Sequence, residues 1–129
     1  MREIKFRAKR TDTGAWVYGD IQHVQRINTK EEAEQSGRRS EPAVRVANYD
    51  VDEETIGQFT GLYDESGRAV FEGDLLSDYD NVIVVGWFDG CFCDCRADTH
   101  VPLTYLEVED REVIGNIYDN KELLERVEK

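Results

Sequence analysis

The chain has 129 residues, within the roughly 100–200 residues of an ordinary domain, so we expect a single domain over residues 1–129. Hydrophobic residues make up 40% of it and charged residues 34%, with two prolines, which is the composition of a soluble folded protein and not of a disordered one. Because no run approaches ~18 uncharged apolar residues and no apolar signal stretch follows Met1, we expect no membrane segment and a cytoplasmic location.

The net charge of −12 is spread unevenly, since the first ten residues hold five basic and one acidic residue, a balance of +4. A chain this acidic is repelled by phosphate backbones, which disfavours nucleic-acid binding in general. Lys5, Arg7 and Lys9 nevertheless alternate along one face of a predicted strand and form a speculative binding face. Charge pairing within the chain or between subunits explains the same asymmetry.

The first third of the chain predicts strands joined by turns. Residues 4–9 alternate apolar and basic side chains as a half-buried strand does, and residues 16–24 read as its hairpin partner with a bulge at Gly19. Residues 28–41 are almost wholly polar and predict a mobile loop, which is either functional or disordered. A third strand is expected over residues 43–47, and a short turn or single helical turn over residues 51–56.

The sharpest local prediction is a hairpin at Asp89-Gly90, because this pair between apolar strands favours a two-residue turn of primed type. The turn pairs Phe88 with Cys91, and Gly86 with Cys93. Both faces of this hairpin are apolar near its tip, so we expect a cover on each side. The cover is either the rest of the domain or a second subunit, which makes a homo-oligomer one of the expected states.

The three cysteines, Cys91, Cys93 and Cys95, together with His100 suggest zinc at first sight. Alternate residues on a strand lie ~6.6 Å apart, whereas structural zinc sites use two cysteines on a tight turn. The cysteines therefore read as small, reduced core residues, and we assign no metal ligand and no cofactor.

Four carboxylates, Glu72, Asp74, Asp78 and Asp80, fall close together and could serve a divalent ion or a general acid–base pair. They have no calcium-loop spacing and no histidine beside them, so we interpret them as a solvated acidic rim. His23 and His100 have no identifiable partner in the sequence. No catalytic residue is assigned, and the chain is not expected to be an enzyme.

The chain ends in a strand over residues 113–118 and a helix over residues 121–128, with Asp119 and Glu122 as a capping box and an apolar stripe of Leu123, Leu124 and Val127. The pattern as a whole predicts an α+β fold that is mainly antiparallel β. Within it, residues 70–118 are expected to form a small SH3-like barrel that the C-terminal helix closes.

Five segments, in this order along the chain, resemble the YopX family. They are residues 1–8 (MREIKFRA), 54–62 (ETIGQFTGL), 71–75 (FEGDL), 112–118 (EVIGNIY) and 122–124 (ELL). Where the family typically has tryptophan after the opening Phe-Arg-Ala, this chain has Lys9.

The resemblance implies a phage- or prophage-encoded protein of unknown biochemical function, made in the bacterial cytoplasm, and it brings no catalytic residues. Our first hypothesis is a non-catalytic interaction or accessory protein whose partner is an unidentified host or phage protein. The alternatives are a nucleic-acid-binding module that uses Lys5, Arg7 and Lys9, and a carboxylate- or metal-dependent hydrolase built on residues 72–80.

Overall fold

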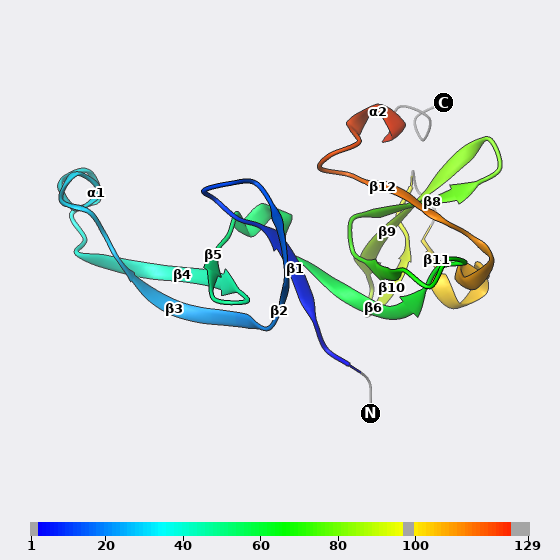
Figure 1. Cartoon of the computed structure of the whole chain (residues 1–129), viewed down its shortest axis with the longest axis horizontal. Helices are drawn as coiled ribbons and strands as arrows, with labels where there is room; N and C mark the ends of the chain where they lie inside the picture. The colour runs from blue at the N-terminus through cyan, green and yellow to red at the C-terminus, as the bar shows by residue number, and fades with distance from the viewer. Residues whose placement is uncertain (1–2, 97–99, 125–129) are drawn as a thin grey trace. The chain divides into compact units, whose positions relative to one another are not determined.

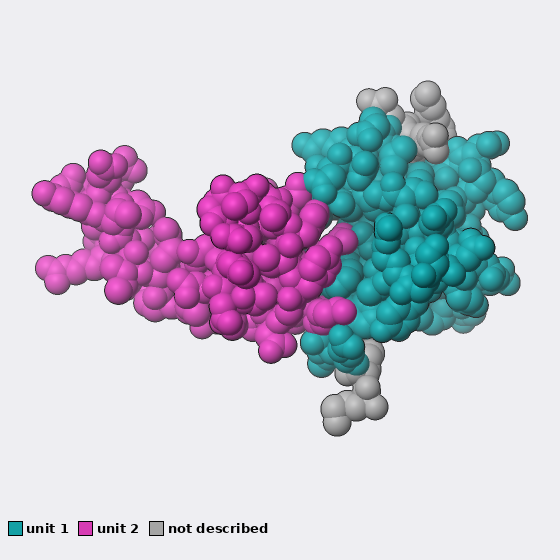
Figure 2. Space-filling model, viewed as in Figure 1, with its two compact units in different colours: residues 1–4, 57–129 teal, residues 5–56 magenta. Residues whose placement is uncertain are grey.

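The computed structural model describes residues 3–96 and 100–124 (Figure 1). The chain divides into two compact units, which are coloured separately in Figure 2: unit 1 comprises residues 1–4 and 57–129, and unit 2 comprises residues 5–56. The strand pairs within each unit are antiparallel and the helices are few, so the predicted mainly antiparallel β class is confirmed. The single domain over residues 1–129 stays a prediction.

Unit 2 begins with the predicted hairpin, in which β1 (Phe6–Lys9) pairs with β2 (Trp16–Gly19). The expected strand over residues 16–24 is split, because β3 (Ile21–Ile27) pairs with β4 (Ser40–Val46) and not with β1. The change of partner occurs at Gly19, where an added Cβ would lie 3.0 Å from the Cβ of Ala47. A residue without a side chain therefore lets the two backbones approach at this corner. β5 (Tyr49–Asp50) completes the sheet beside β4.

The loop predicted over residues 28–41 is wrong at its centre, because helix α1 (Lys30–Ser36) lies there, at the far end of the β3–β4 hairpin in Figure 1. Thr29 caps the helix: its hydroxyl oxygen accepts from the Glu32 N–H at 3.2 Å, and the Glu32 carboxylate accepts from the Thr29 N–H at 2.9 Å. The helix ends at Gly37, which has φ 74°. None of the helical side chains is buried. The polar composition of the segment thus fits a helix that is exposed to solvent. Its mobility stays a prediction.

The core of unit 2 is small, with Ala8, Val46 and Val51 at its centre. The predicted helical turn is the 3-10 turn η1 (Glu53–Thr55), in which the Asp52 side chain accepts from the Glu54 N–H at 3.1 Å. The Thr55 hydroxyl accepts from the Lys9 N–H at 2.9 Å and donates to the Asp52 carbonyl at 2.6 Å. A buried threonine thus joins this turn to β1.

In unit 1, β6 (Gly57–Tyr63) pairs with β7 (Ala69–Phe71), and a five-stranded sheet follows in the spatial order β11-β10-β9-β8-β12. Its strands are β8 (Asp74–Asp78), β9 (Asn81–Phe88), β10 (Cys91–Asp94), β11 (Val101–Pro102) and β12 (Val113–Asn116). The hairpin register is the predicted one, with Phe88 opposite Cys91. Asp89 and Gly90 have φ of 51° and 82°, as a primed turn requires.

The core of unit 1 consists of aliphatic side chains from β7, β8, β9 and β12 and from two turns. It comprises Val70, Leu76, Ile83, Val85, Leu103, Val108 and Val113. Leu103 and Val108 come from two 3-10 turns, η2 (Leu103–Tyr105) and η3 (Val108–Asp110), which precede β12. The chain therefore closes this core with short turns before its last strand returns to β8.

The last strand is shorter than predicted, because the turn after β12 is held by side chains. The Asn116 carboxamide oxygen accepts from the N–H groups of Tyr118 and Asp119, and that of Asn120 accepts from the Asn116 N–H. Helix α2 (Lys121–Leu124) follows. Residues 125–128 of the predicted helix, with Val127 of its apolar stripe, lie outside the described residues.

Candidate functional site

The speculative basic face is partly buried. The Arg7 side chain is 6% exposed and its guanidinium carbon lies 4.7 Å from the centre of the Trp16 ring, while the Lys9 Nζ lies 5.5 Å from the same ring. Lys5 is half-buried. The structure thus brings Arg7 and Lys9 to one indole, as expected of a shared strand face, but an open row of three cations does not form.

A second cation–aromatic pair, which the sequence did not reveal, lies in the same unit. The Arg10 guanidinium carbon is 4.2 Å from the centre of the Tyr49 ring, and the Nε and Nη2 of Arg10 donate to Asp12 at 2.9 and 2.6 Å. These hydrogen bonds lower the pKa of Asp12. Arg10, Arg45 and Tyr49 line a hollow of about 250 Å³. Arg10 forms a β-bridge with Val51, and the Thr11 N–H donates to the Asp50 carbonyl at 3.1 Å, so the pairing of distant segments brings Tyr49 to Arg10. No local sequence pattern predicted this pairing.

The four carboxylates expected as an acidic rim are separated by the fold. Glu72 accepts from the Gln58 N–H at 3.0 Å, and Asp74, 2% exposed, accepts from the Phe71 N–H at 2.8 Å. Asp78 binds two arginines, whereas Asp80 is exposed. Over residues 3–96 and 100–124, no three His, Cys, Asp or Glu side chains are grouped to hold a metal ion. The structure therefore assembles no carboxylate site from these four residues. The prediction of a solvated acidic rim is wrong for Asp74, which is buried.

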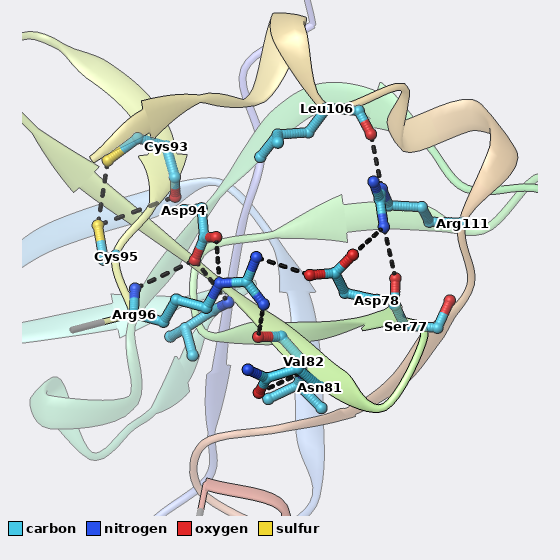
Figure 3. Close-up of polar contacts among 11 residues, drawn as sticks. Ser77, Asp78, Asn81, Val82, Cys93, Asp94, Cys95, Arg96, Leu106 and Arg111 are labelled. Carbon is cyan, nitrogen blue, oxygen red and sulfur yellow. Dashed lines mark hydrogen bonds and ion pairs between the residues drawn. The ribbon is translucent and has the colours of Figure 1, made fainter. Parts of the chain in front are cut away.

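The most organised polar cluster is formed by Asp78, Asp94, Arg96 and Arg111, which we call the ion network (Figure 3). Arg96 lies at its centre and binds Asp78 at 2.6 Å through Nη2 and Asp94 at 2.7 Å through Nε. Arg111 binds the other oxygen of Asp78 at 2.9 Å. Asp94 is 1% exposed, so this charge is buried and paired.

The ion network also satisfies backbone carbonyls. Arg96 donates to the Val82 carbonyl at 2.9 Å, and Arg111 donates to the carbonyls of Leu106 and Ser77 at 2.6 and 3.0 Å. Asp78 ends β8, Asp94 ends β10, and Arg111 follows η3. The network therefore ties two strand ends of the sheet to the turns that precede β12.

Asp78 stays ionised within this network. Its burial alone would raise the pKa, but the hydrogen bonds from Arg96 and Arg111 outweigh burial and hold the pKa below its ordinary value. Both of its oxygens accept from a guanidinium. The arrangement suits a rigid cross-link better than proton transfer, which needs a carboxylate poised near neutral pH.

A signal for the ion network was present in the predicted hairpin. The register places Asp94 and Arg96 on the strand face that also carries Ile83 and Val85, and charges on an apolar face must be paired. Asp78 and Arg111 could not be inferred in the same way, because their meeting depends on where η3 delivers the chain.

The cysteines form a close pair and a third thiol. Cys93 is fully buried, as predicted for a core residue, whereas Cys91 and Cys95 are half-buried, and all three are free. The sulfur atoms of Cys93 and Cys95 lie 3.1 Å apart (Figure 3). Burial, and to a smaller extent the hydrogen bond with Cys93, raises the pKa of Cys95 to about 12.

The two histidines lie in different surroundings. His100 stacks on the Phe88 ring, with centroids 3.9 Å apart, and His23 lies exposed on β3.

The tip of the β9–β10 hairpin presents aromatic rings to solvent. Trp87 and Phe88 are 54% and 49% exposed. Phe92 packs edge-on against Trp87 at 4.8 Å, and His100 stacks on Phe88. We call Trp87, Phe88, Phe92 and His100 the aromatic tip. The cover expected over both faces of this hairpin is incomplete at the tip among the residues that the structure describes.

No helix in the described part of the chain has the length and apolar composition that crossing a membrane requires.

The antiparallel strand pairs and the few short helices define a mainly antiparallel β protein. Its ion network has a structural role. The family model described as YopX protein matches residues 5–125, nearly the whole length, and the chain belongs to this family. The resemblance seen in the sequence is confirmed.

The fold is also similar to a solved structure, the crystal structure of protein EF1440 from Enterococcus faecalis. The TM-score is 0.57 at 24% sequence identity, over 96% of this chain and 99% of that one. This likeness shows the fold alone. No curated protein matches the chain.

Proposed function

We propose that this chain is a phage- or prophage-encoded accessory protein that acts by binding another protein, host or phage, in the bacterial cytoplasm and without catalysis. The observation that carries the proposal is the aromatic tip. Tryptophan and other aromatic side chains are enriched at the centres of protein interfaces, where they fill pockets on the partner. Half-exposed Trp87 and Phe88, at the end of β9 beside the hairpin turn, are placed for such a role.

The charge of unit 1 indicates the kind of partner. Its residues 1–4 and 57–129 include seven Lys and Arg against eighteen Asp and Glu, a net charge of −11. Charge complementarity across an interface speeds encounter and selects partners. We infer a partner that has an apolar pocket for the tip and a basic rim around it.

The fold that presents the tip is, in this proposal, an SH3-like barrel over residues 70–118 with the C-terminal helix closing it. Support comes from the meander β8–β9–β10, from η2 and η3, and from β12, which pairs back onto β8. Small barrels of this kind leave hairpin ends free to carry binding residues.

The test compares two double substitutions in the whole chain. Trp87→Ser with Phe88→Ser removes the tip, whereas Tyr79→Ser with Tyr105→Ser removes two rings that are 98% and 77% exposed on the same unit and not on this hairpin. We expect chemical cross-linking in host lysate to give a protein adduct that the tip variant loses and the control variant keeps. Adducts that survive the loss of the tip, or the absence of any specific adduct in permissive hosts, would refute the proposal. Light scattering shows whether the partner is a second copy.

A nucleic-acid-binding role of unit 2 is the alternative, favoured by the cation–π contacts of Arg7 and Lys9 with Trp16 and of Arg10 with Tyr49. Residues 5–56 hold nine basic and ten acidic residues, so unit 2 lacks the strong negative charge of unit 1. Single strands bind to such aromatic and cationic surfaces by stacking and phosphate contact. The alternative requires measurable affinity for single-stranded DNA or RNA at low salt that falls when Lys5 and Lys9 become glutamine. Undetectable affinity there removes it.

A further inference from the structure

The Cys93–Cys95 pair has the geometry of a dithiol that is close to bridging. The two sulfur atoms are 3.1 Å apart, so they need to approach by about 1 Å to reach the length of a disulfide bond. Cys93 is the residue before the last in β10, where it pairs with Gly86, and Cys95 follows that strand. Both thiols turn toward each other in Figure 3.

The opposite strand makes room for this approach. A Cβ on Gly86 would lie 2.6 Å from the Cys95 sulfur, so the glycine of β9 leaves the space in which that sulfur sits. The Cys95 N–H donates to the Val84 carbonyl at 2.8 Å, which fixes the backbone of Cys95 against the same strand. The backbones of both cysteines are thus held against β9, since Cys93 pairs with Gly86.

We propose that Cys93 and Cys95 form a reversible intramolecular disulfide by exchange with an external disulfide of the glutathione type. The Cys95 thiol, the more exposed of the two, loses its proton and attacks one sulfur of the external disulfide, forming a mixed disulfide and releasing one thiolate. Cys93 then loses its proton and attacks the Cys95 sulfur, which forms the intramolecular bond and releases the second thiolate. Two electrons pass to the external disulfide, and its two thiolates take up the two protons.

One property of the site makes this disulfide easy to reduce, and another makes its formation slow. Alternate residues on a regular strand lie ~6.6 Å apart at Cα, near the upper limit for a disulfide, so the bridge is strained and easily reduced. The exchange is also slow at neutral pH, because burial and the hydrogen bond with Cys93 raise the pKa of Cys95 and leave little thiolate.

The bridge encloses Asp94, the residue between the two cysteines. The Asp94 carboxylate accepts from the N–H groups of Val84 and Arg96, at 3.3 and 3.1 Å, and pairs with the Arg96 guanidinium. Forming the disulfide therefore constrains the backbone on both sides of Asp94, which is the buried carboxylate of the ion network. This consequence does not rest on the proposed binding role of the aromatic tip.

The experiment treats the full chain with graded ratios of oxidised to reduced glutathione at mildly alkaline pH and counts free thiols by alkylation and intact mass. We expect wild type to lose two of its three thiols and the mass of two hydrogens while remaining one chain, with peptide mapping placing the bond between Cys93 and Cys95. Reduced glutathione should restore all three thiols.

Single substitutions make the test specific. Cys91→Ser should keep the oxidation, whereas Cys93→Ser and Cys95→Ser should each abolish the intramolecular bond. The proposal is overturned if Cys91→Ser retains both thiols at high oxidised glutathione, if the mapped bond includes Cys91, or if the product is a bridge between two chains.

Discussion

Unit 1 and unit 2 use charged side chains in different ways. In unit 1, Asp64, Asp74 and Asp94 are buried, and each accepts at least one hydrogen bond from a backbone N–H. In unit 2, the ion pairs Arg10–Asp12 and Arg45–Asp50 lie at the surface, and Asp12 is 60% exposed. Exposed ion pairs contribute little to stability, whereas a buried carboxylate that holds several backbone donors is costly to remove.

The difference teaches that the net charge of a unit does not indicate whether its charged side chains are buried in the fold or exposed to solvent. Unit 1 carries −11 against −1 for unit 2, yet it is unit 1 that places carboxylates inside its fold. Its larger aliphatic core and the backbone donors around each buried carboxylate offset the cost of taking these charges out of water. Unit 2 has a small core and keeps most of its charges solvated.

The largest effect that we expect comes from Asp64→Ala in unit 1. Asp64 is 5% exposed and accepts from the N–H groups of Ser66, Arg68 and Val113, at 2.9, 2.8 and 3.0 Å. At about 1.5–3 kcal/mol for a hydrogen bond to a charged group, the loss should destabilise the chain by about 3 kcal/mol or more in urea unfolding.

The matched control is Asp12→Ala in unit 2, whose carboxylate is solvated and binds Arg10. We expect no measurable change in the unfolding free energy. Trp87 reports on unit 1 and Trp16 on unit 2, so fluorescence of single-tryptophan variants can assign each transition. Equal effects of the two substitutions would break the comparison between the units.

Acid should destabilise unit 1 through the same groups. Burial would raise the pKa of Asp64 and of Asp78, but the backbone hydrogen bonds of Asp64 and the arginine bonds of Asp78 outweigh it and leave both pKa values low. A folded-state pKa below the unfolded one contributes stability that is complete above about pH 4 and is lost as pH falls through the folded value. We expect the urea midpoint to be flat from neutral pH to about pH 5 and to fall steeply below pH 4.

The pH profile has its own control in Asp78→Asn. This variant should be less stable than wild type at neutral pH and should show a shallower fall in acid, because one of the two groups no longer takes up a proton on unfolding. An acid limb of unchanged slope would show that Asp78 does not contribute to it.

Local patterns of the sequence predicted those features that neighbouring residues decide. Asp89-Gly90 fixed the hairpin register because both residues accept positive φ, and every later pair followed from it. Helix α1 was equally local, since Thr29 and Glu32 form a capping box, but the polar composition of residues 28–41 concealed it. Composition was there a weaker guide than the spacing of two residues.

Features that depend on distant parts of the chain were not predictable in the same way. Asp64 reads as a turn residue, and nothing near it shows that Val113 supplies one of its donors. The burial of Arg7 was also not predicted, because the alternation of residues 4–9 indicates an outward side chain. In the structure, Trp16 of the partner strand covers Arg7. The ion network required the positions of β8, β10 and η3 together.

Salt should change the urea midpoints of the two units differently, and this effect should be smaller than the effect of acid. The net charge of −11 repels itself within unit 1, and added salt screens exposed charges over a Debye length of ~10 Å at 0.1 M. We expect the Trp87-reported urea midpoint to rise with sodium chloride and the Trp16-reported midpoint to change little. Replacing exposed Glu109 and Asp110 by Gln and Asn should reduce the rise in unit 1, and a rise that persists unchanged would point to ion binding instead of screening.

The smallest effect should follow Thr29→Ala at the start of α1. The substitution removes the hydroxyl that accepts from Glu32, and loss of such a cap weakens a helix by about 0.5–2 kcal/mol. Because α1 buries no side chain, its unfolding need not disturb the core of unit 2. Amide hydrogen exchange should therefore show faster exchange at Ala33 and Gly37, with Val46 and the urea midpoint unchanged. Thr29→Ser keeps the acceptor and should retain protection, whereas a lower midpoint for Thr29→Ala would show that the helix supports the β3–β4 pair.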